Sequence, residues 1–252
     1  MRMMPVLATD RHAWTNRWRF IHPGEKALFV AGLLVADFAL PAAAVAPQVF
    51  SAAYLATVAG AGVPGRAFWG VMAVPAGFLL AGIPALALSV DLGGAGPALS
   101  LSPEGLALAA AVSLRSLAAV ACLAFLILTT PVPDLLRLAR RLGMPPALVE
   151  LAYLMHRLVF VVLERAAAAR QAQGARLGYC NSCCSIRSLG LLAGGLFLRS
   201  LERGRRLDLG LAARGYQGEL RVLGREPELS PKRLALAAAA VTVVVALAMV
   251  PR

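Results

Sequence analysis

Two arginines in the second half of the chain stand in closely similar short motifs. The motifs are Ala175-Arg176-Leu177 and Ala213-Arg214-Gly215. Arginine is always charged, and its guanidinium donates several directed hydrogen bonds to carboxylates or backbone carbonyls at an interface. Taken singly, each motif describes a solvated charge near a helix C-terminus. Because the motif occurs twice, 38 residues apart, the pair predicts a partner with two equivalent grooves, such as a dimer of similar subunits.

Two long helices are predicted to carry these arginines at their C-terminal ends. From Ala147 the chain is helical in pattern for about 30 residues. Polar residues recur there every seven positions and form one polar stripe on an apolar helix, namely Glu150, Arg157, Glu164 and Gln171. A second helical run extends from Ser188 to about Arg214, with several arginines on one face. Glycines near both ends favour a helix stop followed by a turn. A short amphipathic helix is also predicted over 134–142, between two proline-containing breaks.

The composition is that of a membrane protein. Hydrophobic residues make up 59% of the 252 residues, charged residues make up 15%, and the mean hydropathy is +0.72, which is far more apolar than a soluble domain. A transmembrane helix needs about 20 mostly apolar residues. We therefore expect an all-α, polytopic helical membrane protein with about five transmembrane helices. The five stretches are 27–45, 48–63, 68–90, 105–129 and 234–250.

Basic residues predict the orientation of the chain and its division into parts. Residues 1–26 hold five Lys and Arg, residues 137–233 hold seventeen, and the loop 91–104 holds none. Because short cytoplasmic loops carry the excess of Lys and Arg, we expect a cytoplasmic N-terminus and an external 91–104 loop, in a plasma or inner membrane. We also expect no cleavable signal peptide. The predicted parts are a basic cytoplasmic N-terminal segment (1–26), a transmembrane bundle (27–130), a cytoplasmic or membrane-surface coupling module (131–233) and a C-terminal transmembrane helix (234–252).

Two charged residues fall inside predicted transmembrane stretches. Asp37 lies in the first stretch and Arg115 in the fourth. By insertion scales each costs on the order of 3 kcal/mol at the bilayer centre unless it is paired or hydrated. Two interpretations stay open: the two side chains form an intramembrane ion pair, or they contact a partner subunit.

Few residues suit catalysis or metal binding. The three histidines are widely separated, and no G-x-x-x-x-G-K-[ST] phosphate loop occurs in the sequence. Cys180 and Cys183 have C-x-x-C spacing, but no second pair or nearby histidine completes four ligands. We therefore expect no metal site, no cofactor, no catalytic residue and no ATP hydrolysis by this chain. Free thiols are expected for all four cysteines, namely Cys122, Cys180, Cys183 and Cys184.

Several short motifs occur in a fixed order along nearly the whole chain. They are Asp10-Arg11 with the lead-in from Asn16 to Lys26, Thr129-Thr130-Pro131, Arg140 to Pro145, Gln173 to Tyr179 and Ala213 to Gly218. In this order and spacing the chain resembles the transmembrane T component of energy-coupling factor (ECF) ABC transporters, in particular the cobalt/nickel CbiQ-like branch. Ala213-Arg214-Gly215 matches the Ala-Arg-Gly motif of that family in full. In the first motif, Leu177 stands where the family often has glycine.

The resemblance implies a non-catalytic transporter subunit. In that family the two motifs end coupling helices that dock in grooves of two ABC ATPase subunits, while a separate membrane S component captures the substrate. This implies that the chain links ATP hydrolysis by its partners to uptake of cobalt or nickel. No nucleic-acid partner is implied, and the lipid bilayer is the surrounding medium. The implied ATPase-docking residues are Ala175, Arg176, Leu177, Ala213, Arg214 and Gly215.

Other functions fit parts of the pattern. The T component of a vitamin ECF importer would carry the same ATPase-facing motifs. A non-transport membrane scaffold would not need them, so it predicts that Arg176 and Arg214 can be lost without consequence. An intramembrane enzyme fits less well, because the chain lacks H-E-x-x-H and G-x-S-x-G motifs.

Overall fold

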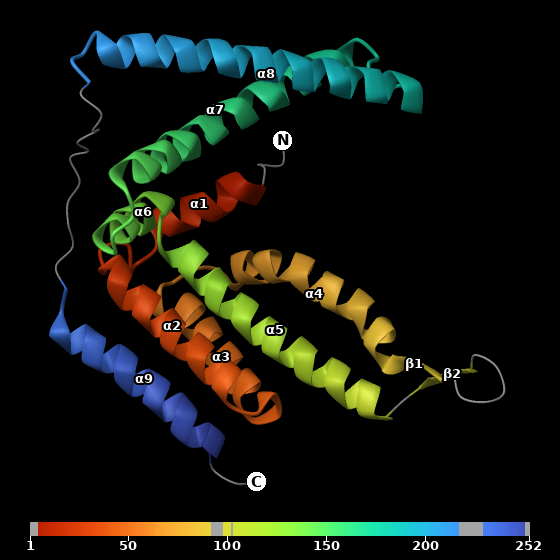
Figure 1. Cartoon of the computed structure of the whole chain (residues 1–252), viewed down its shortest axis with the longest axis vertical. Coiled ribbons are helices and arrows are strands. Elements are labelled where there is room, and N and C mark those ends of the chain that lie inside the picture. The colour runs from red at the N-terminus through yellow and green to blue at the C-terminus, as the bar shows by residue number, and fades with distance from the viewer. Residues whose placement is uncertain (1–4, 92–97, 102, 217–228, 250–252) are drawn as a thin grey trace. The chain divides into compact units, whose positions relative to one another are not determined.

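The computed structural model describes residues 5–91, 98–101, 103–216 and 229–249. Contacts divide the chain into two compact units, Met1–Leu135 with Arg225–Arg252 and Leu136–Gly224. Part of the predicted external loop (92–97 and 102) lies outside the described residues, as do Gln217 and Gly218 of the second motif. The described chain is almost entirely helical (Figure 1).

A helical bundle forms the first unit. Helix α5 is central, because it packs against α1, α2, α3 and α4, while α9 packs against α2 and α3 (Figure 1). A short antiparallel hairpin joins α4 to α5, with Leu88 of β1 opposite Leu101 of β2. The elements are α1 (Pro5–Thr15), α2 (Pro23–Ala39), α3 (Ala42–Leu55), the π-helical turn η1 (Ala56–Gly60), α4 (Gly65–Ala87), β1 (Leu88–Asp91), β2 (Ala98–Leu101), α5 (Pro103–Thr129) and α9 (Pro231–Met249).

The core of the bundle combines small residues with a few aromatic rings. Phe125 of α5 is buried and meets the rings of Trp18 and Phe29 edge to face, with centroid distances of 6.0 and 5.6 Å. Alanines such as Ala118 and Ala121 line the same helix at full burial. Because small side chains let helices approach closely, these positions fix the packing of α5 against its neighbours.

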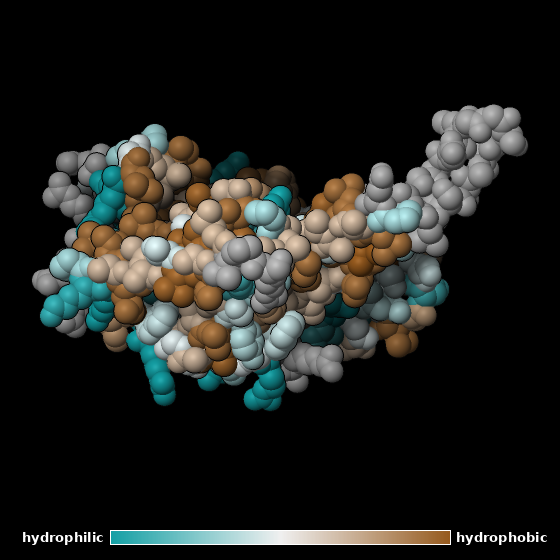
Figure 2. All heavy atoms as spheres, turned by 90° about the horizontal axis from the view of Figure 1, so that it is seen from below, coloured by the Kyte–Doolittle hydropathy of each residue, from teal (hydrophilic) through white to brown (hydrophobic). Residues whose placement is uncertain are grey.

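The outer surface of the bundle is also apolar. Large side chains such as Phe38, Phe78 and Leu236 are 65%, 79% and 74% exposed. Hydrophobic residues cover much of the face seen in Figure 2. Exposed apolar surface of this extent suits lipid tails and not water.

Two long helices make up most of the second unit. They are α7 (Pro146–Ala175) and α8 (Ser182–Ala212). Helix α6 (Val132–Arg141) precedes them and begins in the first unit. Its bounds nearly match those of the short helix predicted over 134–142. Proline at the first turn suits the start of α7. Helix α8 begins six residues before the predicted Ser188, because the Asn181 side chain caps it by accepting a hydrogen bond from the Cys184 N–H at 2.7 Å.

Six helices of the described chain have the length and apolar composition to cross a membrane. Four of them correspond to predicted stretches, with ends that match or are shifted by a few residues: 48–63, 68–90, 105–129 and 234–250. The other two are α7 and α8. The predicted first stretch, 27–45, is divided: α2 ends at Ala39, Leu40 is extended, and Pro41 precedes α3. The all-α polytopic membrane fold is confirmed. The helices differ from the prediction at α7, at α8 and at the divided stretch 27–45.

Candidate functional site

The first arginine motif forms the end of α7. Arg176 caps the helix, and its backbone N–H donates to the Gln173 carbonyl at 3.1 Å. The Leu177 N–H then donates to the Gly174 carbonyl at 3.1 Å, and the Gly178 N–H to the Gln173 carbonyl at 2.9 Å. Leu177 itself has a left-handed backbone, with φ of 58°. This pair of bonds around a left-handed residue is the Schellman motif.

The second arginine motif forms the same turn at the end of α8. The Gly215 N–H donates to the Ala212 carbonyl and the Tyr216 N–H to the Leu211 carbonyl, both at 3.0 Å, and Gly215 has φ of 75°. Arg214 therefore occupies the position that Arg176 occupies in the first turn, and its N–H also donates to a carbonyl three residues earlier at 3.0 Å. Leu177 adopts the backbone that Gly215 adopts, so the leucine does not change the turn.

Both guanidinium groups are available to a partner. Arg176 and Arg214 are exposed, and neither side chain has a hydrogen bond or ion pair with another residue of the described ranges. Each lies beside the carbonyl end of a helix of about thirty residues, where the helix dipole favours a positive charge. The exposed arginines thus extend from rigid helix ends.

A set of hydrogen bonds holds the first turn against the start of α8. Gln173 donates from Nε2 to the Ser188 carbonyl at 3.0 Å, and its Oε1 accepts from the Tyr179 hydroxyl at 2.7 Å. The Ser188 hydroxyl donates to the Gly178 carbonyl at 2.8 Å. The Arg170 guanidinium lies over the Tyr179 ring, 5.9 Å from its centroid. Gln173 and Tyr179 were noticed in the sequence only as parts of a motif, and their bonds give them a supporting role.

A long-range hydrogen bond holds the second turn. The Tyr216 hydroxyl donates to the Glu150 carboxylate at 2.7 Å, which links the end of α8 to the first turns of α7. This hydrogen bond, with a smaller contribution from burial, raises the pKa of Tyr216, because the carboxylate stabilises the protonated phenol. Glu150 was predicted as one member of the polar stripe of α7, and the stripe gave no sign of this partner.

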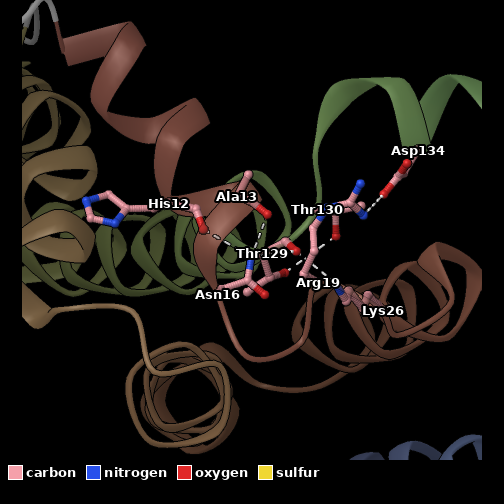
Figure 3. A network of polar contacts seen from close by, with 8 residues as sticks. All are labelled: His12, Ala13, Asn16, Arg19, Lys26, Thr129, Thr130 and Asp134. Atoms are coloured by element: carbon pink, nitrogen blue, oxygen red, sulfur yellow. Dashed lines mark hydrogen bonds and ion pairs between the residues drawn. The ribbon is translucent and has the colours of Figure 1, made fainter.

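A second polar network lies in the bundle unit, at the N-terminal lead-in (Figure 3). Lys26 donates to the Thr129 carbonyl at 2.7 Å, and Asn16 donates to the same oxygen at 3.2 Å. Arg19 pairs with Asp134 at 2.5 Å. Burial lowers the pKa of Lys26, which precedes the apolar stretch 27–45, to about 8. The network ties the N-terminal segment to the end of α5 and the start of α6, so two distant sequence motifs form one buried cluster.

Comparison with known proteins identifies the family. The model of the cobalt transport protein family CbiQ matches residues 15–223. The chain is 41% identical to the cobalt transport protein CbiQ of Rhodobacter capsulatus over 234 residues, which covers 92% of this chain and 94% of that protein. It is 31% identical to the cobalt transport protein CbiQ of Salmonella typhimurium, over 83% of this chain and 97% of that protein. The chain belongs to the CbiQ family.

A further relative of this CbiQ family member is a fused protein. The putative fused cobalt transport protein CbiMQ of Methanocorpusculum labreanum is 34% identical over 131 residues, which cover 52% of this chain and 22% of that protein. The match is therefore to one part of a longer chain. The family assignment agrees with the resemblance drawn from the motifs, to the T component of ECF transporters.

The two intramembrane charges of this CbiQ family member, Asp37 and Arg115, interact electrostatically but are not hydrogen-bonded to each other, so the ion-pair interpretation stays a prediction. Arg115 donates from Nη2 to the Leu40 carbonyl at 2.8 Å, and neither carboxylate oxygen of the fully buried Asp37 has a hydrogen-bond partner in the described structure. The Leu40 carbonyl is open to Arg115 for a local reason: α2 ends at Ala39, and a carbonyl at a helix C-terminus lacks an intrahelical donor. Arg115 satisfies that carbonyl.

The cysteines of the chain are all free thiols. Cys122 is buried in the bundle, whereas Cys180 and Cys183 are exposed near the start of α8. Across the described ranges, no three His, Cys, Asp or Glu side chains gather in a way that would hold a metal ion.

Proposed function

We propose that this CbiQ family member is the transmembrane energy-coupling subunit of an ECF-type ABC importer, and that Arg176 and Arg214 dock in two partner ATPases. One observation carries the proposal: the two exposed arginines occupy the same position of two Schellman turns. A pair of similar ATPase subunits offers two equivalent grooves, and two equivalent projections suit such a pair. Guanidinium groups donate directed hydrogen bonds to carboxylates and carbonyls, which are the acceptors that we expect in such grooves.

The support around each turn suits the transmission of force. Hydrogen bonds from Gln173 and Ser188 hold the first turn, and the bond between Tyr216 and Glu150 holds the second. A load applied to either arginine by ATPase closure would therefore move a long helix instead of bending the turn. We propose that α7 and α8 carry this motion to the membrane bundle and to a substrate-binding S component.

The proposed cargo is cobalt or nickel. The relatives from Rhodobacter and Salmonella are both named as cobalt transport proteins, and these names support a cobalt transport role for this chain. The proposed role for this subunit is non-catalytic: ATP hydrolysis belongs to the ATPases and ion capture to the S component.

The proposed topology keeps the N-terminus and the region 131–233 on the cytoplasmic side. The seventeen basic residues of 137–233 support this orientation. Helices α7 and α8 have the length to span a membrane, but both arginine turns must reach soluble ATPases. We therefore assign α7 and α8 to the cytoplasmic membrane surface, as part of the region that follows the bundle (27–130) in the sequence and precedes the C-terminal span (234–252).

Charge reversal tests the docking role directly. The full chain would be purified with its ATPase subunits as the wild type, Arg176→Glu, Arg214→Glu and the double variant. We expect each single change to reduce ATPase retention about tenfold, because a charge-assisted hydrogen-bond network contributes roughly 1.5–3 kcal/mol. The double change should abolish both retention and cobalt uptake.

Arg205→Glu provides the matched control, since Arg205 is an exposed arginine of α8 away from the turn. It should retain the ATPases. All variants should keep the thermal stability of the wild type, because the reversed side chains are exposed. Full assembly of the double variant would refute the docking proposal and favour a membrane scaffold.

Purification of the wild-type complex from native membranes tests the cargo. Recovery of the ATPases with a metal-binding membrane subunit supports cobalt or nickel import. Recovery of the ATPases with a vitamin-binding subunit would preserve the coupling role and overturn the proposed cargo.

A further inference from the structure

A basic cleft lies between α7 and α8, away from both arginine turns. Its volume is about 220 Å³. Helix α7 supplies two valines and one arginine, and α8 supplies most of the charged side chains. The lining residues are Val161, Val162, Arg165, Leu196, Arg199, Ser200, Glu202, Arg203 and Arg206.

The charges around this cleft are unbalanced. Four arginines surround it with one carboxylate, Glu202, which pairs with Arg206. The side chains of Arg165, Arg199 and Arg203 have no hydrogen bond or ion pair with any residue of the described ranges. Like charges brought together in this way repel one another, and an anion between them would remove the repulsion.

The inner wall of the cleft is apolar. Val161, Val162 and Leu196 are half-buried there, next to the arginine groups. A free inorganic anion would gain nothing from these side chains. An amphiphile with an anionic head and a hydrocarbon tail would contact both parts of the lining.

We propose that this cleft binds an anionic phospholipid, with its phosphate between Arg165, Arg199 and Arg203 and an acyl chain along the valines and Leu196. The forked donors of arginine match phosphate oxygens in pairs. A lipid is the occupant favoured over an acidic protein segment, because the chain is a multi-pass membrane protein and lipid is its constant neighbour. The proposal does not depend on ATPase docking, since none of the lining residues belongs to either turn.

Lipid titration of the full chain tests the proposal. The purified chain in detergent would be titrated with phosphatidylglycerol or with phosphatidylcholine of the same acyl chains, and bound lipid would be counted by native mass spectrometry. Each basic residue near an anionic headgroup contributes roughly fivefold in binding. The variant with Arg165, Arg199 and Arg203 all changed to Gln should therefore bind phosphatidylglycerol on the order of a hundredfold more weakly.

A second triple variant controls for net charge. Arg157, Arg187 and Arg205 come from the same two helices but do not line the cleft, and changing all three to Gln should leave the tight phosphatidylglycerol site intact. Inorganic phosphate at the same concentration as the lipid should not displace it, because phosphate lacks the acyl contact. Thermal unfolding of both triple variants checks that neither change acts by unfolding the chain.

Three outcomes would overturn the proposal. Equal binding of phosphatidylglycerol and phosphatidylcholine by the wild type would mean that the cleft does not select an anionic lipid. Displacement by phosphate would reduce the site to a simple anion site. Loss of the ATPases by the cleft variant, with lipid binding unchanged, would assign the cleft to a protein partner.

Discussion

The ends of α7 and α8 share one backbone turn but are supported in opposite ways. At the end of α7 the turn is enclosed: a Cβ atom on Gly178 would lie 2.8 Å from both the Gln173 carbonyl oxygen and the Ser188 Oγ. At the end of α8 the corresponding residue is Tyr216, whose side chain extends to Glu150. The Schellman geometry therefore sets the position of each arginine, while the surroundings of the turn are free to differ.

The left-handed residue is the second difference between the two ends. Gly215 takes this conformation without a steric cost, whereas Leu177 holds it with a bulky side chain that is 75% exposed. A leucine in this conformation costs about 1–2 kcal/mol, so the surrounding hydrogen bonds must offset it. The more strained turn is thus also the more enclosed one.

The largest effect is expected from adding one methyl group to the enclosed turn. Gly178→Ala places a Cβ against a backbone carbonyl, and we expect a loss of about 2 kcal/mol in the free energy of unfolding. Gly174→Ala is the matched control, since a Cβ there meets nothing within 4 Å inside a helix. It should stabilise the chain by about 0.5–1 kcal/mol. Thermal unfolding in detergent measures both changes.

The same two alanine variants can be compared for their retention of the ATPases. Gly178→Ala should lower retention through the first turn, whereas Gly174→Ala should leave it unchanged. Equal stability of the two alanine variants would mean that the turn at Gly178 is not enclosed. The ends of α7 and α8 would then not differ in enclosure.

A smaller effect is expected from exchanging the left-handed residues. Gly215→Leu should destabilise the second turn by about 1 kcal/mol, and Leu177→Gly should stabilise the first by up to about 1 kcal/mol, because only glycine adopts this backbone freely. Hydrogen exchange at the backbone amides of the two turns measures each change locally. Stability changes of opposite sign, a loss for Gly215→Leu and a gain for Leu177→Gly, support the assignment of one turn type to both helix ends. Changes of the same sign would contradict it.

The sequence was sufficient for the features that rest on composition and on short-range patterns. The apolar stretches 68–90, 105–129 and 234–250 predicted α4, α5 and α9, and the glycines near Arg176 and Arg214 indicated where α7 and α8 end. These signals work because helix stops are local events that involve about six residues.

Contacts between distant residues were not predictable in the same way. The bond from Tyr216 to Glu150 joins positions 66 residues apart, and the bond from Lys26 to the Thr129 carbonyl joins positions 103 apart. Neither pairing leaves a periodic pattern in the sequence. The hydrogen bond from Arg115 to the Leu40 carbonyl was missed for a related reason, since this backbone acceptor appears only once α2 is seen to end there.

The smallest predicted effect concerns the open turn and its dependence on pH. Glu150 raises the pKa of Tyr216 above its ordinary value of 10.0, so the folded chain keeps the phenol proton at a pH where the unfolded chain loses it. The stabilisation from this bond is therefore complete below pH 10 and is lost as the pH rises through the raised pKa. The difference in melting temperature between the wild type and Tyr216→Phe should shrink above pH 10. In a Glu150→Gln background the carboxylate is absent, and the same difference should be smaller at every pH below that range. A difference that stays constant with pH in the wild-type background would show that Tyr216 does not tie α8 to α7 through a charged acceptor, and the contrast between the two helix ends would then rest on the enclosure of Gly178 and on the left-handed residues Leu177 and Gly215.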